Sequence, residues 1–208
     1  MNGSKQGSEE DGVCAMYIIA KYSHKDGDDF ILRNHPQELD EIKQVIAQVD
    51  ATRFKTKRSR EKTMPGRMLY SPIKLNMEFK RRFEALGWKR VRMDIETAVP
   101  EIERVHKGYR EMDLVKNRLG LEVQFGKYAF MVYNILAKMT IFAKQGIIDS
   151  GVEVVSMLDL ASEMSTGVSY FEQVKGDLEY RGESNIDIPI LILGVDAVKR
   201  PYRRTSTI

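Results

Sequence analysis

Two carboxylates nine residues apart, Asp113 and Glu122, give the first indication of chemistry in the sequence. They lie in the stretch DLVKNRLGLEVQFGKY (113–128), where Lys-Asn-Arg at 116–118 has the composition of a tight turn. Folding the chain there would bring Asp113 back towards Glu122. Carboxylates a few Å apart repel each other by roughly 4 kcal/mol at an effective dielectric near 20. One of them therefore takes up a proton, pairs with a local Lys or Arg, or shares a divalent cation with the other.

The strand that carries Glu122 alternates between apolar and other residues. Every second residue from Leu119 to Phe125 is apolar, and this face must contact the core. Glu122 and Gln124 are then neighbours on the opposite face, which we expect to be the more open one. Oxygen ligands without a nearby His or Cys favour Mg²⁺ over zinc.

Hydrophobic periodicity and turn residues predict the elements that position this hairpin. The predicted strands are 16–23, 151–157 and 188–195. The predicted helices are about 36–49, 77–86 (with Asn76 as its cap and Gly87 as its stop), 100–109, 127–144 and 167–180, with a helical turn at 159–164. This order favours a single α/β domain over 16–198, in which helices flank a mixed central sheet. Residues 1–15 are expected to be a disordered leader, and residues 199–208 a basic tail.

Composition excludes several classes of protein. The 208 residues are 42% hydrophobic and 30% charged, as in ordinary soluble domains. No apolar run approaches the ~20 residues that span a bilayer, and the polar N-terminus lacks the apolar core of a signal peptide. Cys14 is the only cysteine, which excludes an internal disulfide and a cysteine metal cluster. We therefore expect a cytoplasmic protein that does not bind membranes.

Basic residues are concentrated in one part of the chain. Residues 53–92 contain fourteen Lys and Arg but three acids, a net charge of +11, whereas the remainder carries −8. Within this part, residues 53–67 have no apolar periodicity and contain Pro-Gly, so they should form a loop. A basic run is often only a solvated face. The alternative is a surface that binds the phosphates of a nucleic acid.

Four stretches resemble the PD-(D/E)xK nucleases, in the branch of type II restriction enzymes that includes BglII and BstYI, with the strongest likeness to BstYI. Asp113 is followed nine residues later by Glu-x-Gln in EVQFGKY (122–128), ahead of an apolar helix. The other stretches are KTKRSREKTMPGRMLYSPIKLN (55–76), EMSTGVSYFE (163–172) and NIDIPILILGV (185–195). Together they cover the chain from about Tyr17 to Val195.

The resemblance implies a homodimeric, Mg²⁺-dependent endonuclease that cuts double-stranded DNA at a palindrome centred on GATC. The site would be RGATCY or AGATCT, and cleavage would leave 5′-phosphate ends. In this pattern Asp113 and Glu122 are metal ligands together with the carbonyl of Val123, and Gln124 occupies the third catalytic position. Lys127 is expected to contact a base edge.

The same pattern assigns further DNA contacts. Ser165 and Thr166 precede a helix, so they can cap it, and the resemblance adds contacts to the outer base pair in the major groove. The family has Ser where this chain has Thr166, which leaves the preference at that base pair open. The basic loop would bind the DNA backbone through Lys55, Lys57, Arg58, Arg60 and Lys62.

Gln124 replaces the Lys that most of the wider superfamily has at the third position. A Gln side chain cannot take a proton near neutral pH, so it cannot be the general base, although it can orient a water molecule. Two alternatives to the restriction enzyme are left open, and Gln124 favours only the second. The chain could be a structure-selective repair endonuclease on the same fold, or a DNA-binding protein that does not cleave.

Overall fold

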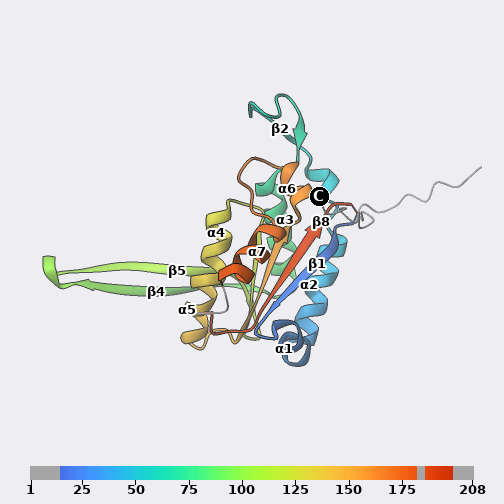
Figure 1. Cartoon of the computed structure of the whole chain (residues 1–208). Coiled ribbons are helices and arrows are strands. Elements are labelled where there is room, and N and C mark those ends of the chain that lie inside the picture. The colour runs from blue at the N-terminus through green and yellow to red at the C-terminus, as the bar shows by residue number, and fades with distance from the viewer. Residues whose placement is uncertain (1–14, 182–185, 199–208) are drawn as a thin grey trace, which may run out of the picture.

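A six-stranded sheet forms the centre of the molecule, and helices cover both of its faces (Figure 1). The computed structural model describes residues 15–181 and 186–198, so most of the predicted leader and all of the predicted tail lie outside it. The strand order is β1-β8-β7-β6-β5-β4, in which β6, β7 and β8 are parallel and the other neighbours are antiparallel. The strands are β1 (Tyr17–His24), β4 (Lys89–Val99), β5 (Arg104–Lys116), β6 (Leu119–Gln124), β7 (Ser150–Ser156) and β8 (Ile190–Asp196). The predicted mixed sheet is confirmed.

Two apolar cores lie on the two faces of the sheet. The first packs under α1 (Gly27–Asn34), α2 (Pro36–Gln48), α3 (Pro72–Ala85) and α6 (Leu158–Ser162). The second packs under α4 (Tyr128–Tyr133), the π-helical turn η3 (Asn134–Lys138), α5 (Met139–Lys144) and α7 (Phe171–Arg181). Within the described residues, no helix is long and apolar enough to cross a membrane.

The β5–β6 hairpin forms as the sequence predicted. Its turn residues Asn117 and Arg118 both have positive φ angles, 46° and 69°, which is the geometry of a type I′ turn. Along β6 the odd-numbered residues pack into the first core. Glu122 and Gln124 therefore point to the other face, towards α4, η3 and α5.

The helix predicted over 100–109 is wrong. Instead, β4 and β5 pair from Arg92–Glu111 out to Val99–Arg104 and form a long arm that projects from the sheet (Figure 1), with a short 3-10 turn η2 (Pro100–Ile102) at its tip. Ile102, Val105 and Tyr109, whose spacing suggested a buried helical stripe, are 61%, 54% and 52% exposed. Pairing of β5 with β4 outweighs the helical spacing of these apolar residues, because each residue of β5 in the arm pairs with a residue of β4.

The basic segment also has more structure than a loop. After a 3-10 turn η1 (Ala51–Phe54), β2 (Lys57–Arg58) pairs with β3 (Met68–Leu69), and we call residues 57–69 the basic hairpin. The helix after it begins at Pro72 rather than 77, because Ser71 is its cap: the Ser71 side chain accepts a hydrogen bond from the Lys74 N–H. Gly87, with φ 87°, follows the end of this helix as predicted.

Candidate active site

Asp113 and Glu122 occupy neighbouring positions on β5 and β6. Leu114 pairs with Leu121 in the ladder, so the next residues along the two strands are Asp113 and Glu122. The backbone N–H of Asp113 donates a hydrogen bond to the Glu122 carboxylate, and the Asp113 charge acts on the Glu122 carboxylate. The turn at Asn117 and Arg118 is what brings the two acids together.

The face that carries Glu122 is covered, which corrects the expectation of a more open face. Glu122 is only 4% exposed and Gln124 is half-buried, because α4, η3 and α5 lie over this part of the sheet. Asp113 is different, since 51% of its side chain is exposed. The site is therefore open to solvent on the β5 side and closed on the helix side.

Each carboxylate has a cationic partner. The Lys138 Nζ lies 2.8 Å from the Glu122 Oε1, and the Lys80 Nζ lies 2.9 Å from the Asp113 Oδ1. The Arg90 Nε is a second neighbour of Asp113, at 3.8 Å. Pairing with Lys or Arg, one of the outcomes that the sequence allowed, is thus what the structure contains. No group of three or more His, Cys, Asp and Glu that could hold a metal occurs within residues 15–181 and 186–198.

A third acid, Glu153, lies beside this pair, and the sequence interpretation missed it. In the parallel ladder of β6 and β7, Glu153 is the partner of Glu122. It is fully buried; its Oε1 accepts a hydrogen bond of 3.2 Å from the Asn134 Nδ2, and its Oε2 has no partner among the described residues. The available signal was a charged residue in the middle of the mostly apolar strand predicted over 151–157.

Burial dominates the electrostatics of the two glutamates. Loss of solvent raises the pKa of Glu122; the Lys138 ammonium opposes this effect, and the nearby Asp113 charge adds to it. Loss of solvent also raises the pKa of Glu153 well above its usual range, and the charge of Glu122 raises it further. The hydrogen bond from Asn134 acts in the opposite direction on Glu153.

The π-helical turn η3 supplies both polar partners of these glutamates. Asn134 is its first residue and Lys138 its last, and they hold Glu153 and Glu122 respectively. Such single π turns inside α-helices occur often at functional sites. The hydrophobic periodicity predicted one continuous helix over 127–144. It did not reveal the π turn, which changes the direction in which the following side chains point.

Gln124 completes the row of polar residues on β6. An added side chain at Gly126 would collide with the Gln124 Nε2, so the glycine leaves the amide its space. The backbone N–H of the intervening Phe125 donates a hydrogen bond of 3.3 Å to the Asn76 Oδ1, on α3. Val123, whose carbonyl was a predicted ligand, lies between Glu122 and Gln124 with its side chain against the first core.

Lys127 lies beside the segment 163–170, which we call the reading loop because it contains the residues predicted to contact bases. Lys127 and Val168 form an antiparallel bridge, and the Ser169 N–H donates to the Gly126 carbonyl at 2.8 Å. The structure thus brings Lys127 next to the loop that carries Ser165 and Thr166.

The basic hairpin contacts the reading loop through Glu61. The Glu61 carboxylate accepts hydrogen bonds from the Ser165 hydroxyl and from the Thr166 N–H, the latter at 3.1 Å. These hydrogen bonds lower the pKa of Glu61. Both donors are among those predicted to contact DNA, so an acid of the same chain holds them here.

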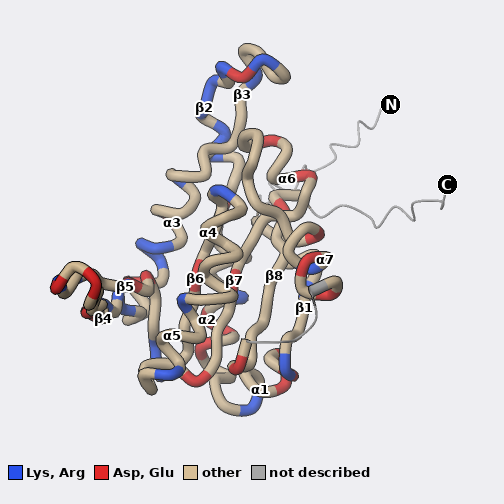
Figure 2. The backbone as a smooth tube through the Cα atoms, turned by 60° about the vertical axis from the view of Figure 1, so that its left-hand side comes forward, with Lys and Arg blue, Asp and Glu red and all other residues tan. Residues whose placement is uncertain are grey.

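The predicted phosphate-binding residues fall into two groups. Lys55 and Lys57 are engaged within the chain: the Lys55 Nζ lies 2.6 Å from the Glu163 Oε2, and the Lys57 Nζ donates to the Met164 carbonyl at 3.2 Å. Arg58, Arg60 and Lys62 are exposed on the basic hairpin, without an ion pair or side-chain hydrogen bond to another described residue. Figure 2 shows basic residues gathered on this hairpin, at the same end of the molecule as the start of α4.

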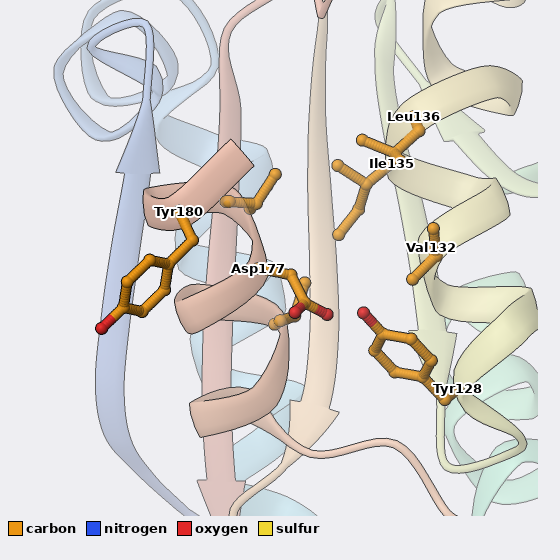
Figure 3. A pocket seen from close by; sticks show the side chains of 8 residues that line it. Tyr128, Val132, Ile135, Leu136, Asp177 and Tyr180 are labelled. Carbon is orange, nitrogen blue, oxygen red and sulfur yellow. The ribbon is translucent and has the colours of Figure 1, made fainter. Parts of the chain in front are cut away.

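A cavity of about 490 Å³ lies elsewhere on this face of the sheet, between α4–η3 and α7 (Figure 3). Its lining is mainly apolar: Tyr128, Val132, Ile135, Leu136, Val174, Asp177, Leu178 and Tyr180. None of Asp113, Glu122 and Gln124 lines it. The polar site on β5, β6 and β7 is therefore distinct from this cavity.

Comparisons with known proteins identify the family. Residues 19–195 match the model of the family "Restriction endonuclease BglII/BglIII". The restriction endonuclease BglII complexed with a DNA 16-mer is similar in fold, with a TM-score of 0.65 and 20% identity over 84% of this chain and 74% of that one. Free BglII gives a TM-score of 0.56 and 18% identity over 84% and 77%. No curated protein sequence matches significantly. The chain belongs to the BglII/BglIII family and is a type II restriction endonuclease, which cleaves DNA at specific sites.

Proposed function

We propose that this restriction endonuclease is a Mg²⁺-dependent homodimer that cuts duplex DNA at a palindrome centred on GATC, RGATCY or AGATCT, and leaves 5′-phosphate ends. One observation carries the proposal: Asp113, Glu122 and Gln124 are gathered on one face of β5 and β6 in a chain of this family. The likeness to BstYI seen in the sequence is the source of the proposed site.

The residues present fit a divalent ion. Restriction endonucleases of this kind depend on a divalent metal, and Mg²⁺ is usually held by one or two carboxylates together with water and phosphate oxygens. Asp113 and Glu122 supply two carboxylates at neighbouring positions, and the Val123 carbonyl is a third candidate ligand. A cluster of three acids is not needed for such a site. When bound, the ion lowers the pKa of coordinated water and polarises a phosphoryl oxygen.

Gln124 would act on the attacking water. Its amide can donate and accept hydrogen bonds but cannot remove a proton. We therefore assign it the role of orienting the water for in-line attack on the phosphorus, with the 3′ oxygen leaving. Gly126 supports this role because it leaves room for the Gln124 amide.

DNA would lie against the end of the sheet where β6 and β7 finish. Lys127 and the reading loop meet there, and the basic hairpin projects from the same end (Figures 1 and 2). We assign base contacts to Lys127, Ser165 and Thr166. We assign phosphate contacts to the hairpin, first through the exposed Arg58, Arg60 and Lys62 and then, after their internal contacts break, through Lys55 and Lys57.

The β4–β5 arm supports the homodimer. A two-stranded hairpin with both faces exposed is marginally stable alone, yet this one carries exposed Ile102, Val105 and Tyr109. Acidic residues gather at its tip, which disfavours DNA as the partner (Figure 2). Phe130 is 59% exposed as well, and it belongs to α4, which lies on the side from which the arm projects (Figure 1). A second copy that covers both surfaces would also place one active site on each strand of a palindrome.

Cleavage of plasmid DNA tests the catalytic proposal. Discrete fragments in Mg²⁺, none in EDTA, and ends that map to GATC-centred sites are expected. Glu122→Gln and Asp113→Asn should each lower the rate by at least about 100-fold, if each removes a ligand of the ion. Asp40→Asn, at an exposed position on α2, is the matched control and should cleave normally. Smeared products would indicate a structure-selective nuclease, and binding without cleavage would indicate a DNA-binding protein.

Sedimentation of two charge-introducing variants tests the dimer. Tyr109→Glu and Phe130→Glu should each shift the protein towards the monomer at micromolar concentration, because each places a charge in an apolar interface. Leu32→Glu, at an exposed position of α1 on the opposite layer, should leave the dimer intact. A monomeric wild type, or dimers in all three variants, would contradict this assembly.

A further inference from the structure

Among the described residues, Lys138 and Glu122 form the most deeply buried ion pair that involves a lysine. Their side chains are 13% and 5% exposed, and 2.8 Å separates the Lys138 Nζ from the Glu122 Oε1. By contrast, Lys80 and Asp113 are 27% and 51% exposed, so solvent screens their pair. The carboxylate proposed to hold a metal ion thus already has a cation in close contact.

The packing of the helix on the sheet places Lys138 close to β6. Lys138 ends the π turn η3, and Met139 after it packs against Gly151 of β7, where a side chain would collide with the Met139 sulfur. The helix therefore approaches the sheet closely at Gly151, whose ladder partner Gly120 lies two residues before Glu122. On β6 itself, the neutral Gln124 occupies the third catalytic position, where most of the wider nuclease superfamily has a lysine.

We propose that Lys138 is a built-in counter-ion, which occupies the Glu122 carboxylate in the metal-free protein and is displaced from it when a divalent cation binds. This inference rests on the proposed function, because it takes Glu122 as a metal ligand. Lys138 is a positioning residue in this scheme: it holds the Glu122 carboxylate in place before the metal arrives.

Two physical points support an exchange rather than a shared arrangement. An ammonium in contact with Glu122 and a divalent cation on the same carboxylate repel each other strongly, because the Glu122 carboxylate is buried and little water screens the two charges. Lysine suits a partner that must leave, because its compact charge sits on a flexible four-carbon stem, whereas the planar guanidinium of Arg binds a carboxylate bidentately. The lysine therefore lowers the apparent metal affinity while it protects the buried acid.

Calorimetric titration with Ca²⁺, without DNA and in alkaline buffer to limit competition from protons, tests the inference. Lys138→Met should bind Ca²⁺ at least about tenfold more tightly than the wild type, because no ammonium has to be displaced. Lys138→Gln keeps a hydrogen-bond donor without the charge, and it should show the same change if the Met variant does not fold. Lys144→Met, at an exposed position at the end of α5, is the matched control and should bind as the wild type does.

The possible results separate this inference from the proposed function. Ca²⁺ binding that Glu122→Gln abolishes and both Lys138 variants strengthen supports the exchange. If Glu122→Gln abolishes binding but the Lys138 variants bind equally or more weakly, the exchange is overturned and the metal site stands. If wild type and Glu122→Gln bind Ca²⁺ alike, Glu122 is not a ligand, and both proposals are overturned. A merely structural Lys138 would change folding stability without tightening metal binding.

Discussion

Replacing Glu153 by Gln should remove a pH-dependent loss of stability from this protein. The Glu153 side chain is fully buried, one of its oxygens has no partner among the described residues, and burial raises its pKa well above the usual range. Gln has the shape of the protonated acid but cannot ionise. The variant therefore keeps the packing and the contact with Asn134 while it removes the titration.

The sign and size of the effect follow from proton binding. In the unfolded chain the carboxyl loses its proton near pH 4.5, whereas the folded protein keeps it to higher pH. Between the two pKa values the folded state binds more protons, so stability falls as pH rises, by about 1.4 kcal/mol per unit. From pH 5 to pH 7 the wild type should thus lose up to about 3 kcal/mol relative to the variant, or roughly 6–12 °C in Tm for a chain of this length.

Guanidinium unfolding of both proteins at pH 5, 6 and 7, with EDTA present, measures this difference. The gap in unfolding free energy should widen with pH in favour of Glu153→Gln. Glu84→Gln, at an exposed position on α3, controls for the loss of a carboxylate elsewhere. A gap that stays constant, or that moves in favour of the wild type, would refute the reasoning that Glu153 is buried in its protonated form.

Three further changes test other parts of the structure. Gly126→Ala should displace the Gln124 amide and slow cleavage by about 100-fold with little loss of folding, as a comparison of rates and melting curves will show. Asp149 is partly desolvated, yet hydrogen bonds from His35 and other donors lower its pKa. Asp149→Asn should therefore lower the free energy of unfolding by about 1 kcal/mol at neutral pH after solvent screening. This loss should vanish as pH falls through the folded-state pKa of Asp149. An equal loss at neutral pH and at a pH below that pKa would contradict the prediction. Glu61→Gln should tighten DNA binding about threefold to tenfold, because the reading loop gives up weaker hydrogen bonds, and an unchanged Kd would exclude that role.

The strands of the core could be predicted because their signal is local. Alternation from Leu119 to Phe125 and the apolar runs of β7 and β8 define which face each residue occupies, and the structure buries them accordingly. The arm could not be predicted in this way. Ile102, Val105 and Tyr109 fit a helical stripe by spacing, and only pairing with a second strand, which local spacing does not report, makes them part of a hairpin.

The residues of the candidate active site also differ in whether local sequence could predict their positions. The approach of Asp113 to Glu122 depends on a two-residue turn within the hairpin and was visible in the sequence. Glu153 and Lys138 come from a parallel strand and from a helix on top of it, so their positions depend on tertiary packing. The phase of Lys138 also depends on a π turn, which hydrophobic periodicity does not detect.

The π turn makes the length of the helix that follows β6 critical to one residue. Deleting a single residue between 134 and 138 would restore regular α-helical winding and rotate one half of the helix against the other by about 100°. Met131 anchors the first half in the core, and Met139 and Phe142 anchor the second, so the rotation would force one half out of its packing. The first half begins directly after Lys127. The alignment between the part of the enzyme that meets the bases and the strand that carries the acids is therefore set by one inserted residue.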